Sequence, residues 1–245
     1  LWPAEARCRE EEPRPAGSRS GGSCRGKKRG VSLTVEAICA GRAAMLPGDK
    51  RSAIAKSPLD GPVAIGPRGV AGDEQVDRRH HGFPAMAVHL YPADHYAWLK
   101  QQFDAPSALA GQGSMGENLF VHDVDESAIH IGDRFRLGTA VIEVTQPRQP
   151  CATIERHLGR KGIVKAIVES GRSGFFFRVI EPGIAQAGDT LALMEQGATD
   201  WTVRRAFRLV YGGGKPDREE LEELATLPRA SDRMIHDIRR KHPTA

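Results

Sequence analysis

The chain has 245 residues, 40% of them hydrophobic and 27% charged, proportions typical of an ordinary globular protein with a substantial core. It has no apolar run near the roughly 18 residues of a membrane-spanning helix and only four cysteines, which excludes a membrane-spanning protein and a disulfide-rich miniprotein. The formal net charge of +4 arises within residues 1–30, where eight basic residues stand against four acidic ones, so it does not indicate a nucleic-acid-binding body.

Residues 1–30 are rich in Pro, Gly, Ser and Arg, and a segment with so little to bury is predicted to be disordered. The segment lacks the apolar centre of a secretory signal, and the acidic run Glu10–Glu12 is untypical of a transit peptide. Because the first residue is Leu1, we interpret the segment as an artefact or a translated upstream stretch, with a functional basic arm as the alternative. The expected location is cytoplasmic.

Regular patterning begins near Val31. Alternating apolar and polar residues predict a strand over residues 31–40, and the Gly- and Pro-rich stretch 58–72 predicts short strands joined by tight turns. A further strand is predicted at 86–91, followed by a helix over Pro92–Phe103 because proline is suited to a helix start.

Two Gly-Asp pairs introduce similar segments farther along the chain. Gly132-Asp133 and Gly188-Asp189 each precede an alternating strand, and we interpret both as hairpin corners of a curved antiparallel sheet or small barrel. Further elements are predicted at residues 140–145 (strand), 162–170 (helix) and 174–180 (strand).

The composition shifts near residue 199. Apolar residues spaced for one helix face, with suitable capping residues, predict helices over 200–211, 216–227 and 231–241. The fold class is therefore mainly β with some α (α+β): a β-rich domain over residues 31–198 and a three-helix domain over 199–245. Three such helices also allow a helix-turn-helix DNA-binding unit as a minor alternative.

The four cysteines, at positions 8, 24, 39 and 151, lack the paired short spacings of zinc or iron–sulfur sites, and in a reducing cytoplasm they are predicted to be thiols. Cys151 follows a turn that contains Pro147 and Pro150, next to Arg148. A cationic neighbour favours the thiolate, which is both a nucleophile and a ligand for soft metals. The alternative is a buried cysteine that acts as a small hydrophobic residue.

Residues 31–197 resemble the MOSC domain, named for the C-terminal domain of molybdenum-cofactor sulfurases, in its YiiM-like subgroup, and residues 201–241 resemble the three-helix appendage of that subgroup. The segments that carry the resemblance are, in chain order, Arg51–Lys56, Gly72–Gln75, His81-Gly82, His89–Trp98, Gly116–Leu119, Ile131–Asp133, Gln146–Cys151 and Ser170–Phe176. The resemblance implies a MOSC-type β-barrel with a small C-terminal three-helix bundle.

The resemblance also implies a mononuclear molybdenum centre, held by the dithiolene of molybdopterin and by one protein cysteine, whose position Cys151 matches. Arg148 is then expected to hold the phosphate or the pterin with its guanidinium fork, and Asn118 to contact the cofactor with its amide. Further donors to the anionic cofactor are expected from Ser52, Lys56 and Arg172. For these three the alternatives are a turn hydroxyl, a surface lysine and a solvated turn residue.

His81 is the candidate proton donor for N–O cleavage because its pKa lies near neutrality; His80 is a weaker candidate, and His89 is expected in the core or behind the site. After His81-Gly82 the sequence departs from the family, since Phe83–Met86 stands where relatives continue with Gly-Pro-acidic-basic. If this loop frames the pocket, the departure bears on substrate preference.

The leading functional hypothesis is a molybdenum-cofactor oxidoreductase that reduces N-hydroxylated compounds, of the hydroxylaminopurine or amidoxime type, to amines. Because the chain has neither a four-cysteine cluster nor a flavin fingerprint, electrons are expected from a separate flavin- or iron–sulfur-containing reductase. One alternative is a sulfur carrier with a persulfide on Cys151. Another is a binding module without catalysis, for which nucleic acid is disfavoured by the near-neutral body.

Overall fold

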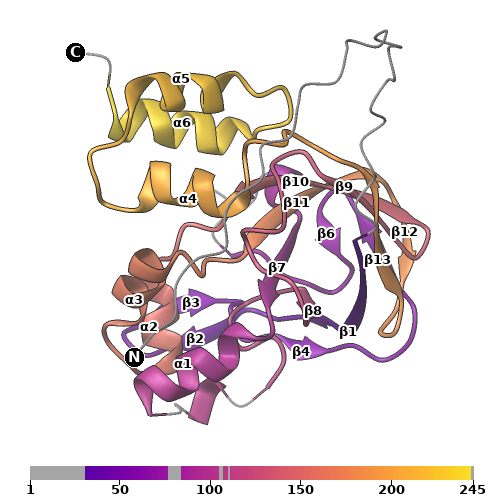
Figure 1. The fold of residues 1–245 in the computed structure, drawn as a ribbon. Coiled ribbons are helices and arrows are strands. Elements are labelled where there is room, and N and C mark those ends of the chain that lie inside the picture. The colour runs from indigo at the N-terminus through magenta and orange to yellow at the C-terminus, as the bar shows by residue number, and fades with distance from the viewer. Residues whose placement is uncertain (1–30, 77–83, 105–106, 110, 244–245) are drawn as a thin grey trace, which may run out of the picture.

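Seven strands form a closed, mixed β-barrel (Figure 1) in the computed structural model, which describes residues 31–76, 84–104, 107–109 and 111–243. In barrel order they are β13 (Thr190–Glu195), β9 (Arg134–Leu137), β10 (Ala140–Pro147), β11 (Phe175–Glu181), β7 (Val88–Pro92), β8 (Leu119–Val121) and β1 (Ser32–Ala40), and β1 pairs with β13 to close the ring. The pairs are antiparallel except β7–β8, which is parallel. The predicted barrel is thus confirmed.

Six shorter strands lie around the barrel. β4 (Ser57–Pro58) extends the sheet beside β1, and β5 (Val63–Gly66), β6 (Gly69–Val70) and β12 (Gly183–Ala185) form a small sheet. β2 (Ala44–Leu46) and β3 (Lys50–Ser52) form a hairpin that the sequence analysis did not predict. The short strands expected between residues 58 and 72 are confirmed.

The helices gather in two groups on one side of the barrel (Figure 1). The first group contains α1 (His95–Phe103), α2 (Ala152–Leu158) and α3 (Ile163–Ser170), with the 3-10 turn η2 (Ser107–Leu109) against α2. Another 3-10 turn, η1 (Pro84–Met86), packs against β11 and β10. The second group contains α4 (Val203–Tyr211), α5 (Arg218–Thr226) and α6 (Asp232–Lys241). Each of the three predicted C-terminal helices is present, while the domain boundary at residue 198 stays a prediction. In the described residues, no helix is both long and apolar enough to cross a membrane.

The helix predicted from Pro92 begins only at His95. Pro92 is instead the last residue of β7 and lies opposite Val121 of β8. The helix prediction was therefore three residues too long at its start, because a proline that suits a helix start also suits a strand end.

The two Gly-Asp pairs are turns but not hairpin corners, which corrects the sequence-based interpretation. Gly132 and Gly188 have φ of 87° and 90°, a left-handed conformation that favours glycine. The turns lead into β9 and β13, which pair with each other, so that Phe135 lies opposite Leu193. The two similar segments therefore form neighbouring strands of the barrel.

All eight residues of β10 are buried, because its outer face is covered by α4. Glu143 in this strand is only 2% exposed and forms ion pairs with three arginines. The Nε atoms of Arg134, Arg178 and Arg229 lie 2.6, 3.4 and 3.5 Å from its carboxylate. Because Arg229 stands between α5 and α6, this buried carboxylate ties the C-terminal helices to the barrel.

Candidate active site

A cavity of about 140 Å³ opens at the end of the barrel where β10 ends. Its wall contains the predicted metal ligand Cys151 and four of the five predicted cofactor residues, namely Ser52, Lys56, Asn118 and Arg148. They come from β3, from the loop after it, from the start of β8 and from the turn after β10. The fold therefore brings together residues that lie up to 99 positions apart.

Cys151 is the half-buried residue directly before α2. The turn that presents it is fixed at both ends, since Arg148 N donates to Gly174 O (2.9 Å) and Ile154 N donates to Cys151 O (3.0 Å). Cys39, the other cysteine in the described residues, is fully buried, and burial raises its pKa to about 12. Cys151 is thus the thiol placed to bind a ligand.

Arg148 is only 8% exposed. Burial lowers the pKa of its guanidinium, and the neighbouring Cys151 acts in the opposite direction. Its Nη1 atom is buried and has no hydrogen-bond partner among the residues that the structure describes. Since an unpaired buried donor is energetically unfavourable, this arginine fits an anionic ligand in the cavity beside Cys151.

Asn118 uses its amide within the protein. Its Nδ2 donates to Cys39 O (3.0 Å) and to Asp73 Oδ2 (2.9 Å), while its Oδ1 accepts from His89 N (3.0 Å). The amide therefore links β1, β7 and the loop that contains Asp73. The expected contact between Asn118 and a cofactor stays a prediction, and one oxygen lone pair remains for it.

The Lys56 side chain is not on the surface, since it is only 8% exposed and forms an ion pair with the Asp73 side chain, which is 4% exposed. Burial lowers the pKa of the lysine, and Asp73 counteracts this. Asp73 also accepts from Gly41 N at 2.8 Å. Its carboxylate therefore holds Lys56, Asn118 and the Gly41 backbone together in this wall of the cavity. Asp73 was not predicted as a site residue, although it lies inside the segment Gly72–Gln75.

The remaining predicted site residues differ in where they lie relative to the cavity. Ser52 Oγ accepts from Ile54 N at 3.2 Å, as expected of a turn hydroxyl. Arg172 is not among the residues lining the cavity, and its guanidinium lies 4.8 Å above the Trp98 ring, a cation–π geometry. His81, like His80 and Phe83, lies outside the described residues.

His89 and Met86 also reach the cavity. His89 is 4% exposed, with Nδ1 3.1 Å from Gly116 O and its ring 4.8 Å from that of Phe176. His89 is therefore buried, as expected, but it lines the cavity and does not lie behind it. Met86, in η1, is buried, so the segment in which the sequence departs from the family does contribute an apolar side chain to the wall.

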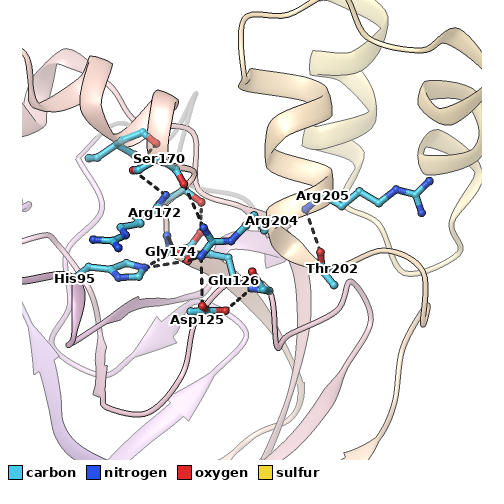
Figure 2. A network of polar contacts seen from close by, with 12 residues as sticks. His95, Asp125, Glu126, Ser170, Arg172, Gly174, Thr202, Arg204 and Arg205 are labelled. Atoms are coloured by element: carbon cyan, nitrogen blue, oxygen red, sulfur yellow. Dashed lines mark hydrogen bonds and ion pairs between the residues drawn. The ribbon is translucent and has the colours of Figure 1, made fainter. Parts of the chain in front are cut away.

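Glu126 is another buried carboxylate that was not predicted from the sequence (Figure 2). It accepts from Gly174 N (2.7 Å) and lies 3.0 Å from His95 Nε2 and 3.4 Å from Arg204 Nη2. Because Gly174 O in turn accepts from Arg148 N, the network connects α1 and α4 to the turn that carries Arg148. The nearby signal in the sequence was only the pair Asp125-Glu126.

Within the described residues, no three His, Cys, Asp or Glu side chains gather as a metal site. A metal bound at Cys151 would therefore have to bring most of its ligands with it. The unpaired Nη1 of Arg148 and the half-buried thiol fit an anionic cofactor that carries its own metal.

Comparison with known proteins identifies the family of the chain. The model of the MOSC domain matches residues 77–192. YflK of Bacillus subtilis is 38% identical over 162 residues, which are 66% of this chain and 72% of YflK. YiiM of Escherichia coli is 34% identical over 174 residues, 71% of this chain and 77% of YiiM. Its crystal structure aligns with a TM-score of 0.69 and 25% identity, over 86% of this chain and 92% of that one.

A Gibberella moniliformis protein named "Reductase" is 35% identical over 184 residues, 75% of this chain but 32% of that protein. The chain thus spans about a third of this relative, whereas it spans more than two thirds of YflK and YiiM. Both the sequence identity and the shared barrel show that the chain belongs to the MOSC domain family, as a YiiM-like member.

Proposed function

We propose that the protein is a molybdenum-cofactor-dependent oxidoreductase that reduces N-hydroxylated compounds, of the hydroxylaminopurine or amidoxime type, to amines. The observation that carries the proposal is the half-buried Cys151 thiol beside the buried, unpaired Nη1 of Arg148 in one cavity. The name of the fungal relative supports reductive chemistry, and the family supports a molybdenum cofactor.

The reaction consumes two electrons and two protons, breaks the N–O bond and leaves the amine and one water. When bound, the cofactor would supply the two-electron chemistry and a metal that accepts oxygen. A soft thiolate ligand from Cys151 suits such a metal. The electrons would come from a separate flavin- or iron–sulfur-containing reductase.

The residues of the cavity have distinct proposed tasks. Arg148 would hold an anionic group of the cofactor through its unpaired donor. Lys56, Asp73 and Asn118 would keep the barrel wall in one geometry through their mutual contacts. Met86 and Phe176 would exclude water from the reacting atoms. His81 remains the proposed proton donor.

Replacement of Cys151 tests this proposal directly. Cys151→Ser, purified from a host that makes molybdopterin, is expected to lose its molybdenum and to lose the reduction of 6-hydroxylaminopurine by a viologen donor. Cys39→Ala is the matched control, because it removes the other described thiol outside the cavity and should retain both.

Retention of molybdenum and activity in Cys151→Ser would overturn the proposal. A wild-type protein without molybdenum, but with a mass increase of about 32 Da on Cys151, the mass of one sulfur atom, would instead identify the persulfide carrier.

A further inference from the structure

A second cavity, of about 540 Å³, lies between the end of the barrel and α6. Four residues line both this cavity and the first one, namely Met86, Cys151, Thr153 and Phe176. The Cys151 side chain therefore stands on the border between the two. The first cavity is bounded by the barrel residues described above, whereas the second has a helix of the C-terminal group as its far wall.

The far wall is one face of α6. Arg233, His236, Asp237 and Arg240 all line the cavity, and their spacing of i, i+3, i+4 and i+7 places them on one side of a helix. Met234 and Ile238 of the same helix are buried in the core. The cavity therefore receives two arginines, one histidine and one carboxylate from α6.

Asp237 orients both arginines. It is 1% exposed and accepts from Tyr211 Oη at 3.1 Å, while Arg233 Nε and Arg240 Nη2 lie 3.3 and 3.4 Å from its oxygens. A guanidinium has five N–H donors, and these are the only hydrogen bonds of the two side chains within the described residues. Two cations against one carboxylate leave this wall positive and rich in donors.

The helix is held in a fixed position relative to Cys151. Ser231 caps α6, since its Oγ accepts from Met234 N at 2.9 Å. The same hydroxyl contacts Gln146 Oε1, and Ser231 N donates to Thr145 O at 3.3 Å. Both partners belong to β10, the strand that leads to Cys151, so the cavity exists without a domain movement.

The two ends of the cavity differ in chemistry. Near Cys151 it has the Phe176 ring and the Met86 thioether, which line both cavities. Gln149 also lines this cavity and adds a polar side chain. Such a wall suits a flat heteroaromatic ring with polar edges. At α6 the arginines suit a phosphate, which guanidinium groups bind through paired hydrogen bonds. The volume lies within the range of about 300–1,000 Å³ that is usual for small-molecule sites.

We propose that the second cavity is the substrate site and that its preferred substrate is an N-hydroxylated nucleotide, whose base faces Cys151 and whose phosphate binds Arg233 and Arg240. The inference rests on the proposed function, because the N-hydroxylated base must reach the reacting centre at Cys151. A phosphate on these arginines could also belong to the cofactor, and the experiment separates the two sources.

The test compares 6-hydroxylaminopurine, its ribonucleoside and its 5′-monophosphate as substrates of the full-length holoenzyme, with a reduced viologen as donor. The wild type should show a KM about tenfold lower for the monophosphate than for the nucleoside, as expected of a charge-assisted contact. Arg240→Gln should remove this difference, leave kcat and the KM for the base unchanged, and keep its molybdenum content. Arg239→Gln is the matched control, because Arg239 is exposed on the same helix and does not line the cavity.

A binding experiment without turnover gives an independent readout. The product nucleotide, adenosine 5′-monophosphate, should bind more tightly than adenosine by calorimetry, and Arg240→Gln but not Arg239→Gln should abolish the difference. Loss of molybdenum in Arg240→Gln would assign the phosphate to the cofactor and overturn the inference. Reduction of the base without any preference for the monophosphate would overturn it while the proposed function stands. Arginine-dependent nucleotide binding without reduction of any substrate would overturn the proposed function, and the cavity would then be a nucleotide-binding site and not a substrate site.

Discussion

The two walls that face Cys151 are built in opposite ways. On the barrel side, the side chains of Lys56, Asp73 and Asn118 are buried, and Asp73 binds the other two. On the α6 side, Arg233 and Arg240 are partly exposed and share one carboxylate. Loss of one partner in a buried network leaves an uncompensated group, whereas exposed charges can be exchanged with little effect on stability. In the proposals made above, the barrel wall would hold the cofactor and the helix wall would set the choice of substrate.

Asp73→Asn is the change that should damage the barrel wall most. It leaves the buried ammonium of Lys56 without its counter-ion, and breaking a buried pair in this way typically destabilises a protein by about 3–5 kcal/mol. Urea unfolding of the cofactor-free protein should show this loss.

The matched control is the double variant Lys56→Met/Asp73→Asn. The remaining amide oxygen can still accept from Gly41 N or from Asn118 Nδ2, both partners of Asp73 in the wild type. The double variant should therefore recover most of the lost stability. If it is as unstable as Asp73→Asn, the hydrogen bonds and not the ion pair hold this wall.

Glu126→Gln should have the next largest effect, because the carboxylate receives hydrogen bonds from Gly174 N and His95. Loss of its charge should lower the free energy of unfolding by about 2 kcal/mol, as for other hydrogen bonds to charged groups. Since Gly174 positions the turn of Arg148, molybdenum content per folded molecule should fall as well. Asp125→Asn is the control, because the Asp125 side chain is 47% exposed and lies 3.4 Å from Arg204; an equal loss there would contradict the positioning role.

Arg148→Met should separate stability from function. The variant removes a buried donor that has no described partner, so the cofactor-free protein should become more stable by about 1 kcal/mol, while molybdenum content is lost. Arg172→Met is the comparison, since Arg172 lies over Trp98 outside the cavity and should retain molybdenum. A cofactor-free Arg148→Met protein less stable than wild type would mean that this guanidinium supports the fold.

Local patterns in the sequence were enough for elements whose partners are near in the chain. Alternation predicted β1, and the cap at Ser231 predicted α6, whose first turn does bind the serine hydroxyl. The helix α2 was missed, although Ile154 and Leu158 are spaced for one face and both are buried. A seven-residue helix has too few turns for its apolar repeat to be recognised in the sequence.

Contacts between distant segments could not be predicted from local patterns. The parallel pairing of β7 with β8 and the burial of Glu143 both depend on segments far away in the chain. Asp73 belongs to the site because Lys56 and Asn118, 17 and 45 residues away, both bind it. The resemblance to the family singled out Cys151 and Arg148, and both line one cavity, but the partners of the neighbouring residues became visible only in the fold.

The smallest expected effect concerns an exposed pair, the counterpart of the buried pair Lys56–Asp73. His122 Nδ1 lies 2.6 Å from Asp94 Oδ1, with side chains 43% and 51% exposed, and the hydrogen bond to Asp94 raises the pKa of His122 above 6.5. A raised pKa contributes stability that is complete below the unfolded value and is lost as the pH rises through the folded value. The contribution should stay below about 1 kcal/mol, because the pair is exposed to solvent.

Urea unfolding of wild type and His122→Gln at about pH 5 and pH 8, on either side of the histidine titration, measures this contribution. The wild type should be the more stable of the two at the lower pH, and the difference should shrink at the higher pH. His122 also packs its ring 5.6 Å from that of Phe120. A difference that does not change with pH would therefore assign the stability to this ring contact, and the exposed pair would contribute nothing measurable.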